Sequence, residues 1–437
     1  MKSLDESPGL RLTTLCVLYI AQGIPFGFLT ITLAAYLAER GVLAADIGHL
    51  AAMCSLPWAL KWIWGPVIDR FTFDKLRMGR RRPWILMAQS LMMFTVIFVV
   101  LVPDLTASVR TLGWIMFIHN IFASLQDVSA DALAVDMLSE AERGRANGMM
   151  YGSSYFGAFL GGAGLGWVTS QYGLQAAMTV QLCMLGAIML APLLLKEHAS
   201  NRRFPWDKVG EDLQPTEAEE ANASLRELMG HLFRAFRLRA PLIAAGLALL
   251  VSIGASLLAA VFVTHLTQKL GWTQEEYSTV IGGKAVFFGL GGSVFGGFLA
   301  DRVGQKRLAG IASVLLGICW LVYSMTEFYW MNKSYLSYMA YLETFLTAVM
   351  TVSLFSLFMS VSWPVVAGTQ FTAYMALLNV SRTIGAWLTG AVKGVPVATI
   401  FVGAGILQIS LISLLWFIDP SQTRRVLGEG PGEPVKT

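Results

Sequence analysis

Charge is scarce in this sequence: Asp, Glu, Lys and Arg make up 14% of its 437 residues, whereas 55% are hydrophobic. The mean hydropathy of +0.59 excludes an ordinary soluble domain and indicates membrane-spanning helices. The net charge of +4 gives no reason to expect a nucleic-acid partner. The four cysteines lie far apart in apolar stretches, which excludes a disulfide framework and a zinc pattern; they are Cys16, Cys54, Cys183 and Cys319.

Sequence signatures of catalysis are also missing. The chain has no His/Asp/Glu metal cluster, no Ser-His-Asp order and no nucleotide-binding loop, so we expect no enzymatic activity, no metal and no cofactor. The largest polar stretch is the loop 196–240, which is too short to be the output domain of a sensor. These absences favour a transporter over a membrane enzyme or a sensor.

Twelve apolar stretches approach the ~20 residues that a bilayer requires. Of the 32 Lys and Arg residues, 24 lie in the tails and even-numbered loops, five in odd-numbered loops and three within spans. Because positive loops stay cytoplasmic, we predict a multi-pass protein of the bacterial inner membrane with both termini in the cytoplasm. The predicted spans are 12–38, 47–68, 84–103, 111–138, 146–169, 174–195, 241–268, 277–300, 308–326, 336–362, 370–392 and 396–418.

An internal repeat divides these spans into two halves. Residues 65–70 and 297–302 end the second and eighth spans with related sequences, at an offset of 232, and 156–160 resemble 384–388 at an offset of 228. Parallel repeats of this kind are typical of secondary transporters. We therefore predict an all-α protein of two pseudo-symmetric bundles of six helices each. Its parts are an N-terminal bundle (1–195), a cytoplasmic linker (196–240), a C-terminal bundle (241–418) and a flexible cytoplasmic tail (419–437).

The linker ends in a stretch with helical periodicity. From about 225 to 239, apolar residues alternate with four arginines at the spacing of an amphipathic helix, and Ser224 with Glu227 makes a capping box before it. Apolar burial and attraction to anionic lipid would hold such a helix on the inner leaflet. An interfacial strap between the two halves is the simpler interpretation, and a regulatory element is the alternative.

The motifs resemble those of the major facilitator superfamily. Residues 297–307 resemble its signature loop, and the first-half copy departs from that pattern because its basic cluster comes late, at 79–82. This departure, with other short motifs, resembles the branch of AmpG-type muropeptide permeases and acetyl-coenzyme A transporters. Those motifs are 22–25, 61–70, 79–84, Gln126-Asp127 with Asp131, 142–144 and 368–371.

The resemblance implies proton-driven import of a bulky, often anionic solute by alternating access, in a protein that acts as a monomer. A muropeptide is the first expectation. A siderophore complex and an acyl-coenzyme A-like anion are the alternatives within the branch, and drug efflux is less compatible with the basic residues in the spans. The partners expected are therefore a small-molecule substrate, protons and membrane lipid.

Carboxylates in the fourth predicted span are the candidates for proton coupling. Asp127 and Asp131 are four residues apart and share one helix face, although a carboxylate within a bilayer costs ~2.5–3.5 kcal/mol. Lys61 lies roughly 12 Å above the inner end of its span, within reach of Asp127. Such a pair would respond to protonation or to an anionic substrate, although Lys61 could also simply extend to the inner surface. His119 is aligned with the carboxylates and is either a proton relay or a residue hydrogen-bonded in place.

Further polar residues within the spans are candidates for substrate binding and gating. Arg382, near mid-depth, suits a substrate carboxylate or phosphate, with Glu343 as an alternative structural partner. Asp136 is expected to bridge to Arg80, Arg81, Arg82 or Arg143. The candidate substrate-binding residues are Lys61, Gln22, Lys284, Arg382, Tyr155 and Asn379, and the candidate gating residues are Asp69, Arg70, Asp136, Arg143, Asp301 and Arg302.

Overall fold

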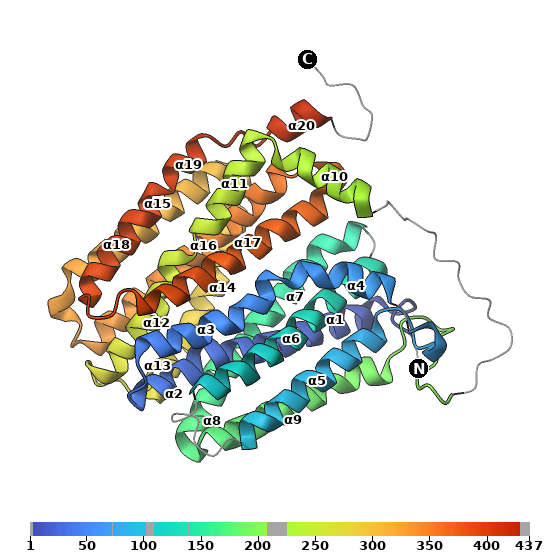
Figure 1. The fold of residues 1–437 in the computed structure, drawn as a ribbon, viewed down its shortest axis with the longest axis horizontal. Helices are drawn as coiled ribbons and strands as arrows, with labels where there is room; N and C mark the ends of the chain where they lie inside the picture. The colour runs from blue at the N-terminus through green and yellow to red at the C-terminus, as the bar shows by residue number, and fades with distance from the viewer. Residues whose placement is uncertain (1–2, 72, 102–108, 139, 208–224, 429–437) are drawn as a thin grey trace. The chain divides into compact units, whose positions relative to one another are not determined.

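The fold is helical throughout the part of the chain that the computed structural model describes (Figure 1). Each predicted span coincides with a helical stretch, because long apolar runs bury their backbone polar groups most readily in helices. The chain divides into two compact units, unit 1 with Met1–Thr216 and Thr267–Val286 and unit 2 with Glu217–Leu266 and Phe287–Thr437. The described residues are 3–71, 73–101, 109–138, 140–207 and 225–428.

Unit 1 contains the helices of the first half of the sequence. Two of its long helical stretches pass through a π-helical turn, at Phe28–Leu33 and at Leu160–Gly164. Another π-helical turn, Ser278–Lys284, follows the short helix α13. The helices are α1 (Pro8–Gly27), α2 (Ala34–Glu39), α3 (Ala44–Ala59), α4 (Trp64–Arg70), α5 (Arg82–Leu101), α6 (Val109–Met137), α7 (Glu140–Phe159), α8 (Leu165–Tyr172), α9 (Leu174–Leu194) and α13 (Gln274–Tyr277).

Unit 2 contains most of the second half. Its first helix, α10, precedes the first long helical stretch of this half and matches the amphipathic helix predicted at the end of the linker. The capping-box side chains of Ser224 and Glu227 lie outside the described residues. The helices are α10 (Leu225–Phe236), α11 (Arg239–Leu250), α12 (Ile253–Gln268), α14 (Ala285–Val303), α15 (Gln305–Met325), α16 (Lys333–Val361), α17 (Ala367–Trp387), α18 (Val397–Ser410), α19 (Ile412–Trp416) and α20 (Gln422–Leu427).

Eight helical stretches of the described residues are long and apolar enough to cross a membrane. The four remaining predicted spans correspond to α3 with α4, α6, α7 with α8, and α17. Each of these four carries a candidate site residue: Lys61, Asp127, Tyr155 or Arg382. Polar side chains reduce the mean hydropathy of a span, so the least apolar helices are the ones to search for a site.

Glycines allow α1 to pack at backbone distance against α7 and the π-helical turn that follows it. A Cβ atom at Gly23 would lie 2.2 Å from the carbonyl oxygen of Ser154, and one at Gly161 would lie 2.0 Å from that of Ile24. Small residues at such contacts permit close helix packing inside a membrane. This contact holds α1 beside the helices that carry the candidate site.

Candidate functional site

Helix α6 carries one stripe of polar residues through unit 1. Asn120, Ser124, Asp127 and Asp131 are separated by four, three and four residues, which places them on one helix face. Asp127 is buried, and its charge would be costly in an apolar setting without a partner. The partners come from the helices packed against this stripe.

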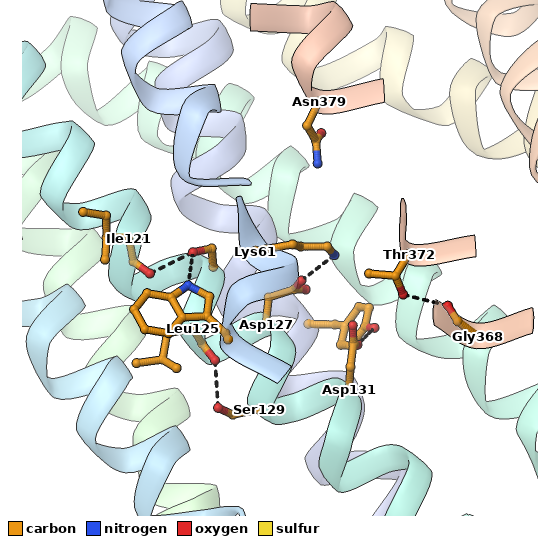
Figure 2. A network of polar contacts seen from close by, with 12 residues as sticks. Lys61, Ile121, Leu125, Asp127, Ser129, Asp131, Gly368, Thr372 and Asn379 are labelled. Atoms are coloured by element: carbon orange, nitrogen blue, oxygen red, sulfur yellow. Dashed lines mark hydrogen bonds and ion pairs between the residues drawn. The ribbon is translucent and has the colours of Figure 1, made fainter. Parts of the chain in front are cut away.

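A helix break supplies the cationic partner. Pro57 cannot donate a backbone hydrogen bond, α3 ends at Ala59, and a 3₁₀ turn over Lys61–Ile63 precedes α4. From this turn, Lys61 Nζ lies 2.9 Å from Asp127 Oδ2 (Figure 2). The two side chains are only 18% and 8% exposed. The ion pair suggested by the sequence is therefore present, and its low exposure limits screening by water.

Two tryptophans flank the pair and fix its surroundings. Trp58 Nε1 donates to Asn120 Oδ1 over 2.8 Å, and Trp64 Nε1 donates to Ser124 Oγ over 3.0 Å. These bonds join both sides of the helix break to the polar stripe of α6. The turn that carries Lys61 is thus held against α6 by three side-chain contacts. Nothing in the sequence signalled these indole partners, since they depend on α3 and α4 packing against α6.

Asp131 has a different partner. The hydroxyl of Tyr19, in α1, donates to Asp131 Oδ1, and the Tyr19 ring meets that of Tyr151, in α7, edge-on at 5.9 Å. Tyr19 therefore connects Asp131, in α6, with Tyr151, in α7. Tyr19 is a member of this network that was not among the predicted site residues, because its contact depends on which face of α1 meets α6.

The network holds two carboxylates against one ammonium group. If all three groups were ionised, Lys61, Asp127 and Asp131 would carry a net negative charge within a weakly polar environment. Binding one proton would make the cluster neutral, which low-dielectric surroundings favour. Protonation of Asp127 would also remove the charge that holds Lys61. Lys61 would then lose its ion-pair partner.

His119 is buried and faces another helix. Its Nδ1 lies 2.8 Å from Thr95 Oγ1 and 3.3 Å from the carbonyl oxygen of Met92, both in α5. Its Nε2 has no hydrogen-bond partner among the described residues. The recorded contacts tie His119 to α5, and none of them joins it to the Asp127 stripe. A relay through His119 stays a prediction.

The other first-half candidates lie on α1 and α7. Gln22 is buried, and its Nε2 has no hydrogen-bond partner among the described residues. Tyr155 is half-buried, one helical turn beyond Tyr151. An amide donor left unpaired in a buried position is costly, so Gln22 is suited to a hydrogen-bonding ligand.

The second-half candidates lie on different elements. Lys284 ends a π-helical turn of unit 1 and is exposed. In unit 2, Arg382 is exposed, and its Nη1 donates to Asn379 Oδ1 over 3.3 Å. Glu343, the alternative partner considered for Arg382, accepts a hydrogen bond from Trp320 Nε1 at 2.8 Å. The structure therefore brings Arg382 and Asn379 together.

A short ion pair joins one gating candidate, Asp136, to one of the arginines expected to bridge to it. Arg81 Nε lies 2.7 Å from Asp136 Oδ2, so one of the four arginines suggested by the sequence does pair with Asp136. Arg302 is exposed, with its guanidinium 4.2 Å from the centre of the Phe298 ring. The side chains of the remaining gating candidates lie outside the described residues: Asp69, Arg70, Arg143 and Asp301.

Backbone amides beside this pair hold a buried carboxylate. The N–H groups of Arg80, Arg81 and Arg82 donate to the Glu197 carboxylate, which lies just beyond α9. Burial raises the pKa of Glu197 above its ordinary value. The basic cluster thus acts partly through its backbone, as the capped N-terminus of α5. The sequence indicated charge at this position but not this role.

Residues 267–286 pack against the first-half helices within unit 1. Gln268 Nε2 donates to the carbonyl oxygens of Ala38, at 2.8 Å, and Val42, at 3.0 Å. Farther along, the backbones of Gly162 and Gly282 approach so closely that a Cβ on Gly282 would lie 2.8 Å from Gly162. A segment from the second half of the sequence is thus bound to the ends of first-half helices.

Comparisons with known proteins agree with this fold. The Major Facilitator Superfamily profile matches residues 15–386. The anhydromuropeptide permease of Escherichia coli (strain K12) is 24% identical over 391 residues, which cover 88% of this chain and 74% of that protein. An uncharacterized protein of Haemophilus influenzae is 27% identical over 177 residues, 40% of this chain and 41% of that relative.

Two solved structures share the fold at 14% sequence identity. A point mutant of the nucleoside transporter NupG superposes with a TM-score of 0.68 over 92% of this chain and 99% of its own. The D-xylose-proton symporter gives 0.69 over 94% and 99%. Both are transporters, and the described helices are those of a multi-pass membrane protein. The chain belongs to the major facilitator superfamily of membrane transporters.

Proposed function

We propose that this protein imports a bulky, anionic, muropeptide-like solute across the bacterial inner membrane together with protons, by alternating access. The observation that carries the proposal is the Lys61–Asp127 ion pair, with Asp131 one turn farther along α6. The match to an anhydromuropeptide permease over most of the chain supports the substrate class. The distribution of Lys and Arg supports a cytoplasmic position for both termini.

Coupling follows from competition for Lys61. A proton that binds Asp127 neutralises its carboxylate and releases the Lys61 ammonium group from the pair. The free ammonium group can then bind an anionic group of the substrate, while Asp131 is a second proton acceptor on the same face. When Asp127 loses its proton to the cytoplasm, it attracts Lys61 again and displaces the substrate. Substrate and proton are thereby carried in the same direction.

The contacts of residues 267–286 with the first-half helices of unit 1 are suited to a gate. In the proposed orientation the Gln268 contacts lie at the periplasmic side, since Ala38 and Gln268 end the first and seventh predicted spans. The gate is held by the Gln268 side chain and by the Gly162–Gly282 contact. While these contacts are formed, the proposed substrate path is closed to the periplasm. Opening it to the periplasm requires the contacts to separate.

Uptake by proteoliposomes tests the proposal. Purified protein is supplied with labelled anhydromuropeptide, ferric siderophore or an acyl-coenzyme A, with and without an inward proton gradient. We expect gradient-dependent accumulation of anhydromuropeptide by the wild type and its loss in Asp127→Asn. Asp46→Asn, at an exposed acid in the first turn of α3, is the matched control and should accumulate normally. The three solutes distinguish the three substrate classes considered within the branch. A drug-efflux transporter would instead move its substrate outward.

Two results would contradict the proposal. Accumulation that is equal with and without the gradient would exclude proton coupling, whatever the solute. Gradient-driven uptake that persists in Asp127→Asn would leave the transporter function intact and remove the Lys61–Asp127 pair from the coupling mechanism.

A further inference from the structure

Helix α10 uses one face to pack against unit 2. Ala235 is buried beside Trp363, whose ring the His231 ring meets at 5.2 Å. One residue after Ala235, the Phe236 ring meets Tyr374 at 5.5 Å. These contacts anchor the helix and settle which of its faces is turned inward. The opposite face is therefore available for another partner.

The opposite face combines apolar and basic side chains. Met229 and Phe233 are 49% and 61% exposed and lie four residues apart, on one stripe. Arg237, four residues farther, places its guanidinium 4.5 Å from the centre of the Phe233 ring. Arg234 is exposed beside them. An exposed ring that carries an arginine presents an apolar body and a cation at the same point.

The same chemistry continues onto the neighbouring helices. Arg239, the first residue of α11, lies 5.0 Å from the ring centre of Phe417, which is 51% exposed just after α19. Ala240 N donates to Gln422 Oε1 over 2.7 Å, so α20 adjoins this point. Because α11 and α19 belong to predicted membrane spans, their ends here mark the level of the bilayer surface.

The arginines of this region are not neutralised by described acidic side chains. Asp419 lies just before α20, and its carboxylate pairs with Arg425, in α20, at 2.7 Å. None of the described carboxylates lies within ion-pair distance of Arg234, Arg237 or Arg239. These three arginines, with the exposed Phe233 and Phe417 rings beside them, are complementary to a lipid surface, where phosphate groups lie above acyl chains.

We propose that this region is a docking surface for anionic phospholipid of the inner leaflet. The guanidinium groups bind lipid phosphates, for which their planar donors are suited, while the apolar side chains enter the boundary between headgroups and acyl chains. Lipid binding would fix α10, and with it the end of the linker, to the membrane. We call it the basic–aromatic surface; it consists of Met229, Phe233, Arg234, Arg237, Arg239 and Phe417.

Hydrogen exchange of the full-length protein in nanodiscs tests this inference. Phosphatidylcholine discs with and without 30% phosphatidylglycerol are compared, and exchange of the α10 amides is followed by mass spectrometry. We expect phosphatidylglycerol to slow exchange in the wild type and not in the triple variant Arg234→Gln, Arg237→Gln, Arg239→Gln. Each arginine that binds the lipid surface should increase the preference for phosphatidylglycerol over phosphatidylcholine roughly fivefold. The charge-matched control removes three cations elsewhere: Arg110→Gln, Lys333→Gln and Lys393→Gln.

Two additional variants separate lipid binding from misfolding. Replacing the three arginines by lysine retains the charges and should preserve most of the phosphatidylglycerol effect. Phe233→Ser retains the arginines but should reduce the effect, because the apolar insertion is lost. Equal exchange in both lipids for the wild type would overturn the proposal. Protection by millimolar inorganic phosphate in pure phosphatidylcholine would overturn it too, because the surface would then bind a soluble anion.

Discussion

Lys61 Nζ and Asp127 Oδ2 lie 2.9 Å apart, and the contact joins the helix break after α3 to the polar stripe of α6. If this pair couples proton and substrate, its two residues act as a unit. Lys61→Ala alone should reduce uptake about tenfold or more, since it leaves a buried carboxylate without its cation. In an Asp127→Asn background the same change should add little.

A double-mutant cycle measures this coupling. Initial uptake rates are compared for the wild type, both single variants and the double variant in proteoliposomes, after correction for the amount of inserted protein. We expect an interaction of ~1 kcal/mol or more. Fully additive losses would show that the two residues act independently, despite their contact.

The hydroxyl of Tyr19 gives a second prediction. Tyr19→Phe removes only the donor to Asp131 and retains the ring that meets Tyr151. A hydrogen bond to a charged group contributes ~1.5–3 kcal/mol, so uptake should fall roughly ten- to a hundredfold at unchanged expression. Tyr172→Phe, at an exposed phenol, is the control. If Tyr19→Phe still reduces uptake in an Asp131→Asn background, the effect does not pass through Asp131.

Sequence patterns were sufficient for the fold and for part of the network. Hydropathy located the helical stretches, and the depth of Lys61 and Asp127 in their spans indicated the ion pair that the structure contains. The contacts of Tyr19 with Asp131 and of Trp64 with Ser124 could not be predicted, because the sequence does not reveal which face of a helix meets a neighbour. Alignment along one helix was also an incomplete guide. His119 was expected to line up with the carboxylates, but its hydrogen bond at 2.8 Å is to Thr95 of α5.

Substitutions of Arg382 test whether this residue acts through its planar guanidinium group or only through its positive charge. If it binds a substrate carboxylate or phosphate through two parallel hydrogen bonds, Arg382→Lys should preserve the charge but lose the bidentate geometry. We expect Arg382→Ala to raise the KM for an anionic substrate by tenfold or more and Arg382→Lys to have a smaller effect. Equal effects of the two variants on KM would argue for a packing role. Asn379→Ala, which removes the recorded acceptor, tests whether the guanidinium needs positioning.

The glycine contact predicts how the proposed gate can be held open. Gly282→Val adds bulk where even a Cβ would lie 2.8 Å from Gly162, so residues 267–286 would be forced away from α8 and the preceding turn. Uptake should fall, and a cysteine at Tyr155, in a background without native cysteines, should react faster with an impermeant thiol reagent from outside. Gly164→Ala has open space around its Cβ and should behave as the wild type. Unchanged labelling in Gly282→Val would exclude this contact as a gate.

The pH dependence of stability should report on the carboxylate of Glu197. Burial raises its pKa above the ordinary value of 4.5, so the folded protein binds this proton more tightly than the unfolded chain does. The resulting contribution is complete below 4.5 and is lost as the pH rises through the elevated pKa, so stability should fall with increasing pH in that window. Thermal unfolding of the purified protein between pH 4.5 and 8 measures this dependence.

Glu197→Gln separates the titration from the backbone contacts of this carboxyl group. The amide cannot titrate, so the variant should show a flatter dependence of Tm on pH than the wild type. The amide also offers one acceptor oxygen where the ionised carboxylate offers two to the N–H groups of Arg80, Arg81 and Arg82, so the variant should lose part of these backbone contacts. Glu327→Gln, at an exposed carboxylate, should leave the slope unchanged. A wild-type slope that survives in Glu197→Gln would assign the pH dependence to other groups.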